Sequence, residues 1–392
     1  MPKHRVISMD KDQSAKETHE AGADTGTAFS MFTHPEKTVP NIFRSKKPFL
    51  IAGPCSAESE EQVLETARAL ALIPGIIGMR AGCWKPRTRP NAFEGHGEKA
   101  LGWLRMAAKE TGLMVCTEVA NAAHAEQALK AGIDMVWIGA RSTVNPFSVQ
   151  EISEALRGSS IPVMVKNPVN PDLSLWIGAV ERLQNSGVSQ IAAIHRGFST
   201  YGKSQYRNAP EWAIPIEFRR QKPEIPLICD PSHIAGKRSL ISHIAQKALD
   251  LDYAGLMIES HPEPDEALSD PRQQLKPEDL AILLKELHYS CSMDEKSGFR
   301  EMLDLLRNKI DTLDRQLLET LAERMEVVSE IAAMKKQIGM SVLQMDRWSG
   351  IFETRTENGL QLGLNGDLIR RLIELVHLES IALQEKIIRG KS

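Results

Sequence analysis

The sequence predicts a parallel (β/α)₈ barrel followed by a separate all-α domain that dimerises. Two observations predict the barrel: eight short apolar runs lie between residues 49 and 259, and segments with helical spacing alternate with them. A third observation predicts the second domain. From Phe299 to Gln337 the chain contains neither proline nor glycine, and its apolar residues recur at the spacing of one long helix.

The eight apolar runs span residues 49–53, 76–81, 113–118, 134–139, 161–166, 190–196, 225–230 and 254–259. Near-continuous apolar strands separated by helices indicate a parallel sheet that is covered on both faces. A doubly wound open sheet is the rival interpretation. It is disfavoured because no Gly-x-Gly-x-x-Gly sequence follows the first run.

Changes in composition divide the chain into four parts. Residues 1–43 are polar and predict a disordered lead-in, residues 44–287 form the barrel, 288–298 form a linker, and 299–392 form the helical domain. Two shorter helices are predicted at 346–359 and 367–388. A helix as long as 299–337 must bury its apolar stripe against companions or another chain, so we expect a homodimer through this domain.

The overall composition excludes several classes of protein. The 392 residues are 42% hydrophobic and 25% charged, with a net charge of −3, which argues against nucleic-acid or basic membrane-surface binding. No apolar run is long enough for a transmembrane helix, and the N-terminus lacks the apolar core of a secretion signal. Five scattered cysteines without a Cys-x-x-Cys pair predict no disulfide framework and a reducing, cytoplasmic location.

Ionisable side chains follow every predicted strand. Barrel enzymes place their catalytic groups at the carboxyl ends of the strands, so this pattern predicts an active site there. In strand order the groups are Cys55; Arg80, Lys85 and Arg87; Glu118; Arg141; Lys166; His195 and Arg196; Asp230 and His233; and Glu259, with His261 and Asp270 just beyond.

Six of these groups are cations, which suit phosphate and carboxylate ligands. They are Arg80, Lys85, Arg87, Arg141, Lys166 and Arg196. The alternative is a set of salt bridges to Glu118, Asp230 and Glu259. Three acids cannot neutralise six bases, so we expect more than one phosphate, or a phosphate and a carboxylate, at this site.

Four other groups form a possible metal site: Cys55, His233, Glu259 and Asp270. Taken singly, they could be a core cysteine, a capping aspartate or a paired glutamate. Together they follow the first, seventh and eighth strands, which are neighbours in a closed barrel. A mixed set of N, O and S ligands suits a divalent transition metal such as Mn²⁺, Fe²⁺, Co²⁺ or Zn²⁺.

Seven motifs in the barrel resemble one enzyme family. "IAGPCSAES", "RAGCWKPRTRPNAFEGHG", "GARS", "VMVKNP", "HRGF", "DPSHIAGKR" and "MIESHPEPDEALSD" resemble the 3-deoxy-D-arabino-heptulosonate 7-phosphate (DAHP) synthases related to 3-deoxy-D-manno-octulosonate 8-phosphate synthases. The resemblance implies condensation of phosphoenolpyruvate with erythrose 4-phosphate. "KPRT" resembles the heptulosonate branch, whereas Asn-Arg is usual in the octulosonate branch, which remains the less favoured alternative.

The resemblance also implies roles for the barrel residues. Cys55, His233, Glu259 and Asp270 would bind the metal, with Mn²⁺ as the first expectation. Arg80, Lys85, Arg141, Lys166 and Arg196 would hold phosphoenolpyruvate. Lys85, Pro86, Arg87, Thr88 and Asp230 would position the sugar phosphate. Lys85, Glu118 or a metal-bound water would handle protons, and Lys85, Cys55 and His233 are the catalytic candidates.

The helical domain resembles a second family, the all-helical chorismate mutases, through "LLRNKIDTLDRQLLETLAER", "KK", "DR" and "LESIALQ". These are dimers that convert chorismate to prephenate. The resemblance implies a pocket made by Arg324, Lys335, Arg347, Ser380 and Gln384, with Arg307 entering from the partner chain. Arg324, Lys335 and Gln384 are its catalytic candidates. Gln344 is a departure, since an acidic residue is expected there.

The fusion suggests control as well as catalysis. Prephenate or chorismate bound to the helical domain would inhibit the barrel, with the linker allowing movement. An alternative role for the helical domain is dimerisation and ligand binding with negligible mutase activity, its charged residues being solvated helix faces. A tetramer formed through the barrel is the further alternative to a dimer.

Overall fold

The computed structural model describes residues 42–44, 48–86, 93–202, 204–289, 297–343 and 345–390. The chain divides into two compact units, Met1–Ser290 and Cys291–Ser392. The predicted disordered lead-in lies outside the described residues except for a short 3₁₀ turn, η1 (Ile42–Arg44). Most of the predicted linker, residues 290–296, also lies outside them.

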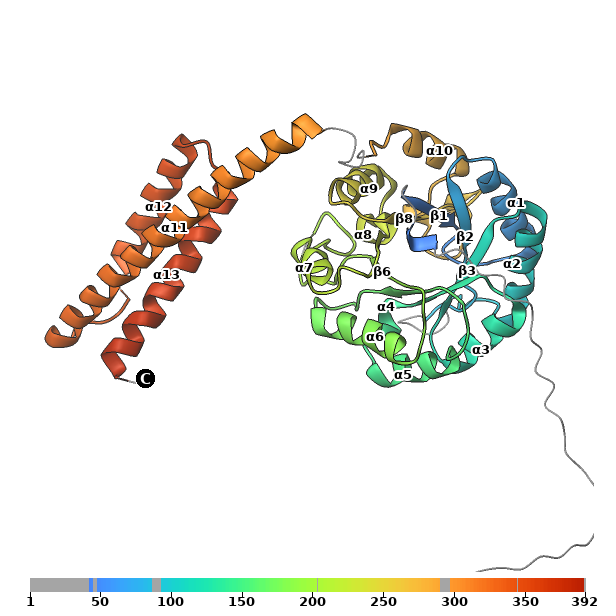
Figure 1. The fold of residues 1–392 in the computed structure, drawn as a ribbon, viewed down its shortest axis with the longest axis horizontal. Helices are drawn as coiled ribbons and strands as arrows, with labels where there is room; N and C mark the ends of the chain where they lie inside the picture. Colours follow the sequence, from blue (N-terminus) through green and yellow to red (C-terminus); the bar gives the residue numbers. More distant parts are fainter. Residues whose placement is uncertain are drawn as a thin grey trace, which may run out of the picture. The chain divides into compact units, whose positions relative to one another are not determined.

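Eight parallel strands close into a barrel in which every strand pairs with its neighbours in sequence and β1 pairs with β8 (Figure 1). The predicted barrel is therefore confirmed. The strands are β1 (Phe49–Gly53), β2 (Ile76–Arg80), β3 (Met114–Val119), β4 (Met135–Ile138), β5 (Val163–Lys166), β6 (Ile191–His195), β7 (Leu227–Cys229) and β8 (Gly255–Glu259).

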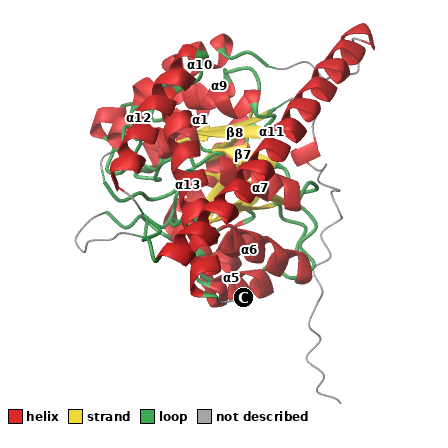
Figure 2. Cartoon of the chain, turned by 90° about the vertical axis from the view of Figure 1, so that its left-hand side faces the viewer, coloured by secondary structure: helices red, strands yellow, loops and turns green. Residues whose placement is uncertain are grey.

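Helices surround the strands of the barrel (Figure 1), and Figure 2 distinguishes the helices from the strands by colour. They are α1 (Glu60–Ala71), α2 (Glu98–Thr111), α3 (Ala122–Ala131), α4 (Ala140–Thr143), α5 (Pro146–Ala155), α6 (Leu173–Asn185), α7 (Ala213–Gln221), α8 (Pro231–Ala235), α9 (Ile241–Asp250) and α10 (Pro277–Glu286). Three 3₁₀ turns, η2 (Arg238–Leu240), η3 (Pro264–Glu266) and η4 (Pro271–Gln273), lie beside α8 and β8.

Local sequence signals set where many of these helices begin and end. The side chains of Ser59, Asn121 and Asp172 accept hydrogen bonds from the first turns of α1, α3 and α6. Gly112 and Gly132 end α2 and α3 in the left-handed conformation that glycine adopts without strain. These caps fix the residues at which the helices that connect successive parallel strands begin and end.

Alternate strand positions build two apolar layers. Leu50 and Ala52 pack in the larger cluster with the helices, whereas Ile51 packs in a second cluster. Its other fully buried members are Phe43, Phe49, Cys116, Met135, Trp137, Met164, Ala192, Ile194, Ile228 and Met257. This second cluster fills the barrel, so the interior is a packed core that supports the strand ends.

Three helices form the second unit: α11 (Ser297–Ile338), α12 (Met345–Gln361) and α13 (Gly366–Arg389). The prediction of one unbroken helix from Phe299 to Gln337 is confirmed. Several apolar side chains of α11 remain about half exposed, among them Leu306 at 53%, Ile310 at 56% and Leu313 at 53%. None of the described helices is long and apolar enough to cross a membrane.

Candidate functional sites in the barrel and the helical unit

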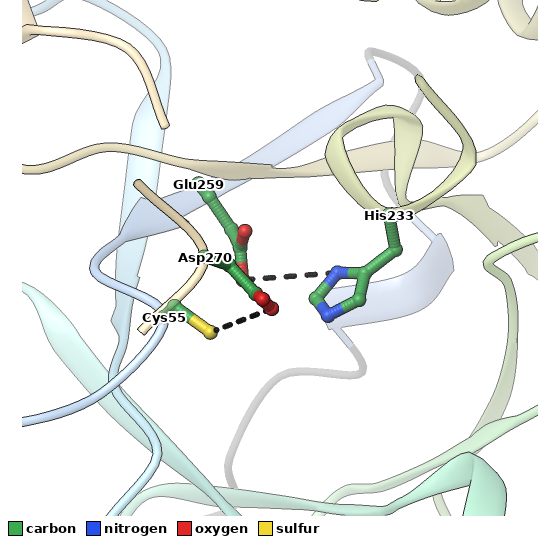
Figure 3. Close-up of side chains that lie close together, drawn as sticks. All are labelled: Cys55, His233, Glu259 and Asp270. Atoms are coloured by element: carbon green, nitrogen blue, oxygen red, sulfur yellow. Dashed lines mark hydrogen bonds and ion pairs between the residues drawn. The ribbon is translucent and has the colours of Figure 1, made fainter. Parts of the chain in front are cut away.

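The four predicted metal ligands meet at the carboxyl ends of the strands. Cys55 follows β1, His233 lies in α8, Glu259 ends β8, and Asp270 precedes η4. One potential ligand atom from each of the four lies within 4.8 Å of those of the others. Their side chains point toward one another in Figure 3. Residues that are up to 215 positions apart in sequence therefore converge on one point.

Tight backbone turns bring these residues together. Gly53 has a φ of 142°, and a Cβ added there would lie 2.2 Å from the carbonyl oxygen of Arg80. Only glycine therefore allows the end of β1 to run so close to β2, just before Cys55. At the seventh strand, Asp230 caps α8 by accepting from the backbone N–H of His233 at 3.1 Å. This cap sets His233 in the first turn of the helix.

The donor set fits a divalent transition metal. Glu259 Oε1 is buried and accepts no hydrogen bond from the described residues, although Arg80 Nη2 lies 3.2 Å away. Cys55 Sγ lies 3.4 Å from Asp270 Oδ2 and 3.1 Å from Lys85 Nζ. Burial, and then the charge of Glu259, raises the pKa of the Cys55 thiol to about 12. A bound cation would favour the thiolate and coordinate the carboxylate oxygen of Glu259 that accepts no hydrogen bond from the described residues.

A cavity of about 520 Å³ opens beside the four ligands. Its lining contains four of the six predicted cations and the predicted residues Pro86 and Glu118. The full lining is Lys85, Pro86, Glu118, Ala140, Arg141, Lys166, Val169, Arg196, Arg207, Asn208, His233 and Asp270. Burial, together with the charges of Arg207 and Arg141, lowers the pKa of Arg196 to about 10. Such crowding of cations favours an anionic ligand.

Of the remaining predicted barrel residues, Arg80 and Asp230 are buried and pair with other buried side chains. Arg80 is 1% exposed and contacts two carboxylates, Asp230 at 3.6 Å and Glu259 at 3.2 Å. Lys166 Nζ lies 2.8 Å from Asp230 Oδ2. These two cations thus form salt bridges with the acids that the alternative interpretation named, and Lys166 also lines the cavity. Arg87 and Thr88 lie outside the described residues.

His195 is a core residue in this structure. Its Nε2 donates to the carbonyl oxygen of Pro210 at 2.7 Å, so its Nδ1 accepts from the hydroxyl of Tyr253 at 3.0 Å. Burial lowers the pKa of His195 to about 3, which keeps the ring neutral. The residue therefore tethers the loop after β6 and does not line the cavity.

The helical unit brings three of the predicted mutase residues together. Arg324 on α11 donates to Ser380 Oγ on α13 at 2.6 Å, and Gln384 Nε2 donates to the carbonyl oxygen of Ser380 at 3.2 Å. Gln384 Oε1 is buried and has no hydrogen-bond partner among the described residues. A guanidinium, a hydroxyl and an amide thus lie close together where α11 packs against α13.

The other predicted mutase residues are less well placed within one chain. Lys335 Nζ donates to the carbonyl oxygen of Val342 at 2.6 Å. Arg307 is 57% exposed and pairs with Asp304 of its own helix at 3.1 Å. Gln344 and the side chain of Arg347 lie outside what the structure describes.

Comparison with known proteins identifies both units. The profile of the DAHP synthetase I family matches residues 38–292, which is more than half of the chain. The chain belongs to the DAHP synthetase I family. The profile of chorismate mutase type II matches residues 306–385. The chain is thus a bifunctional enzyme of the shikimate pathway, with a DAHP synthase domain and a chorismate mutase domain.

Similar proteins support the barrel assignment. Phospho-2-dehydro-3-deoxyheptonate aldolase of Thermotoga maritima is 35% identical over 259 residues, which cover 65% of this chain and 74% of that protein. A crystal structure of this aldolase (DAHP synthase) has a TM-score of 0.55 at 32% identity, covering 61% of this chain and 67% of that one. A 2-dehydro-3-deoxyphosphooctonate aldolase of Nitratidesulfovibrio vulgaris (strain DP4) is 25% identical over 284 residues, covering 67% and 98%.

Two residues of the DAHP synthase cavity were missed by the sequence analysis. Arg207 Nη1 lies 3.0 Å from Asp270 Oδ1, and Asn208 Nδ2 donates to the carbonyl oxygen of His233 at 2.6 Å. Both lie in the loop between β6 and α7, well beyond the strand end. An arginine in a long loop at the carboxyl end of a barrel is a signal that could have pointed to them.

Glu118 is held at the synthase cavity by its neighbours. Its Oε2 accepts a hydrogen bond from Trp137 Nε1 at 3.1 Å. A Cβ added at Gly139 would lie 2.1 Å from Glu118 Oε1. The glycine that follows β4 therefore makes room for this carboxylate.

A second cavity, of about 170 Å³, lies among the three helices of the chorismate mutase domain. Arg324 and Arg355 both line it, and the ring of Trp348 stacks on His377 at a centroid distance of 3.8 Å. Burial, and then the charge of Arg355, lowers the pKa of Arg324. The sequence analysis missed Arg355, Trp348 and His377, because each also fits an ordinary helix position.

Proposed function

We propose that the barrel condenses phosphoenolpyruvate with erythrose 4-phosphate in the 520 Å³ cavity. The observation that carries the proposal is the meeting of cations with Cys55, His233, Glu259 and Asp270 at one mouth. The substrates bring two phosphates and a carboxylate, whose charges match the cation excess. Lys85, Arg141, Lys166 and Arg196 would bind these groups, with Arg80 fixing the carboxylates behind them.

A divalent metal would be held by Cys55, His233, Glu259 and Asp270, with Mn²⁺ first and Fe²⁺, Co²⁺ or Zn²⁺ as alternatives. When bound, the ion would supply Lewis-acid polarisation of the aldehyde of the sugar phosphate. The protein's own task is orientation: the cations place C3 of phosphoenolpyruvate against this aldehyde. Arg87, Thr88, Pro86 and Asp230 stay predictions for the sugar phosphate.

Proton transfer at this cavity falls to Lys85 and Glu118, which both line it. Burial alone would lower the pKa of Lys85, but Cys55, Glu118 and Glu259 raise it above its ordinary value. Lys85 is therefore held as a charged ammonium, and we assign proton donation to it and proton acceptance to Glu118 because both line the cavity. Their assignment stays a proposal.

Product analysis tests the barrel reaction. The purified protein is given phosphoenolpyruvate with either erythrose 4-phosphate or arabinose 5-phosphate, before and after treatment with EDTA. We expect the seven-carbon product, loss of activity with EDTA and recovery with Mn²⁺. Cys55→Ala should lose activity and bound metal together, whereas the matched variant Cys83→Ala, also fully buried, should lose neither. Activity that resists EDTA would contradict the metal site.

We propose that the helical domain converts chorismate to prephenate without a cofactor. Arg324, Lys335 and Gln384, aided by Ser380, would bind the carboxylates and the ether oxygen, and stabilise charge as that bond breaks. Arg347, and Arg307 from a partner chain, stay predicted members of the pocket. The test is chorismate consumption by the wild type, Arg324→Ala and the control Arg370→Ala, since Arg370 is an exposed arginine of α13. A wild-type rate equal to the uncatalysed one would leave only a binding role.

We further propose a homodimer through α11, whose half-exposed apolar side chains support it. Sedimentation would test this state and the alternative tetramer.

Prephenate or chorismate bound to this domain would inhibit the synthase. Unchanged synthase activity at saturating prephenate would contradict feedback control.

The scattered cysteines, four of which are buried and free, support the proposed cytoplasmic location.

A further inference from the structure

Two adjacent glutamines lie behind the proposed metal ligands. Gln273 is 1% exposed and Gln274 is fully buried, in the segment that follows Asp270. Buried amides are costly unless all their groups are bonded. Each of these two amides bonds through both its oxygen and its nitrogen, and the four partners belong to the ligands or to residues beside them.

Gln273 joins Glu259 to Arg207. Its Nε2 donates to Glu259 Oε2 at 2.6 Å, and its Oε1 accepts from Arg207 Nη1 at 2.6 Å. A carboxylate only accepts and a guanidinium only donates, so the amide has one possible orientation. Arg207 also pairs with Asp270. Gln273 thereby occupies one oxygen of Glu259 and leaves Oε1, which accepts no hydrogen bond from the described residues, to face a cation.

Gln274 joins the other side of the cluster. Its Oε1 accepts from the backbone N–H of Cys55 at 2.9 Å, and its Nε2 donates to the carbonyl oxygen of Ser269 at 2.7 Å. Ser269 immediately precedes Asp270, whose φ of 52° is unusual for a residue other than glycine. The amide therefore ties the loop after β1 to the strained turn that carries Asp270.

We propose that Gln273 and Gln274 are positioning residues that hold the four ligands at metal-binding separation before the metal arrives. Ordinary structural glutamines would satisfy local backbone groups. Gln273 instead reaches Glu259, 14 residues away in sequence, and Gln274 reaches the backbone N–H of Cys55, 219 residues away, so one bond of each amide ends at a ligand. Partners of this kind orient the ligands and raise metal affinity. The inference rests on the metal site of the proposed function.

Metal affinity is the first test. Gln273→Met and Gln274→Met keep the side-chain length but remove the amide, and Co²⁺ affinity is measured by competition with a chelator. We expect each variant to bind about 10- to 100-fold more weakly than the wild type. Gln62→Met is the matched control, because Gln62 is also buried and, among the described residues, its side chain bonds only to the backbone N–H of Glu58. Its affinity should not change.

The absorption spectrum of the Co²⁺ protein separates positioning from general damage. At saturating Co²⁺, Gln274→Met should weaken or shift the thiolate-to-metal band of Cys55, while Gln273→Met should retain it. If Gln273→Met does not fold, Gln273→Glu replaces it as the test. The glutamate sets an oxygen against Glu259 Oε2 without loss of volume, so this variant should also bind Co²⁺ more weakly than the wild type. Wild-type affinity and spectrum in folded Gln273 and Gln274 variants would overturn the inference. A wild type that binds no Co²⁺ would overturn the metal site itself.

Discussion

The two sites of this enzyme differ in how complete they are within one chain. In the barrel, buried Arg80 and Lys166 contact buried Asp230 and Glu259, and the ligands and cations lie at or after the ends of seven strands of one chain. In the helical unit, Arg324 bonds to one hydroxyl and Arg307 is exposed. The helices there also leave apolar side chains about half exposed.

The difference teaches what each architecture can organise by itself. A closed sheet fixes eight strand ends around one point, so charges can be buried there and paired. Three helices pack along their lengths, and a pocket between them stays open on the side where no further helix packs. A second chain that packs on that side would complete the pocket. The barrel site should therefore respond to changes inside one chain, and the helical site to changes in assembly.

Removing the buried arginine of the barrel should have the largest effect. Arg80→Met leaves Asp230 and Glu259 without their shared guanidinium, which should destabilise the barrel by about 3–5 kcal/mol. Denaturant unfolding followed separately for the two units measures it, and the helical unit should not change. The exposed arginine of α1 is the control: Arg68→Met should leave the free energy of unfolding close to that of the wild type, because its ion pair with Glu110 is screened by solvent. Equal losses in both variants would refute the role of burial.

Filling the space beside Glu118 should reduce synthase activity while the protein stays folded. Gly139→Ala places a methyl group 2.1 Å from Glu118 Oε1, so the carboxylate must leave its position in the cavity. We expect a loss of about 10²-fold in synthase kcat/KM, the size of one displaced catalytic group. Gly178→Ala, which has open space, should have wild-type synthase activity. Mutase activity should not change in either variant, which separates the two sites.

Breaking the exposed face of α11 should affect only the helical site. Leu313→Glu puts a charge on an apolar position that is 53% exposed in one chain. If a second chain covers it, the dimer should dissociate and mutase activity should fall by about tenfold or more, because burying an unpaired charge is costly. Sedimentation and chorismate consumption measure the two effects. Synthase activity should persist, and a variant that stays dimeric would place the interface elsewhere.

A smaller effect is expected from the second guanidinium of the helical cavity. Arg355 lines this cavity with Arg324, so Arg355→Gln should raise the KM for chorismate about tenfold, as expected for one charge-assisted hydrogen bond. The control is Arg370→Gln, which changes an exposed arginine paired with Asp367. Steady-state kinetics give the comparison. An unchanged KM in Arg355→Gln would show that this arginine faces away from the substrate.

The sequence predicted the sites best where the fold restricts position most. Cys55, Glu118, Lys166 and Glu259 lie at or just after strand ends, and a barrel brings such ends together whatever the loops do. Arg207 was missed because it lies in a long loop, whose path depends on contacts such as that with Asp270.

Some pairings could not be read from the sequence at all. Arg80 and Lys166 were expected to face a substrate, yet both also pair with buried acids, a choice made by side-chain geometry. On α12, helical periodicity identifies the faces of the helix but not which polar residue lines a cavity. That is why Arg355 was not distinguished from the other polar residues of α12.

The pairing of β1 with β8 has a consequence for how this enzyme is made. Phe49 pairs with Gly255 and Gly53 with Glu259, so the first strand has no partner on one side until the last has been synthesised. A ribosome-bound chain that ends before residue 255 contains Cys55 and His233 but not yet Glu259 or Asp270. The barrel can therefore close only after β8 has been made, and slow, long-range closure of this kind exposes strand edges meanwhile. Translation that pauses between β8 and α11 would favour correct folding of this chain.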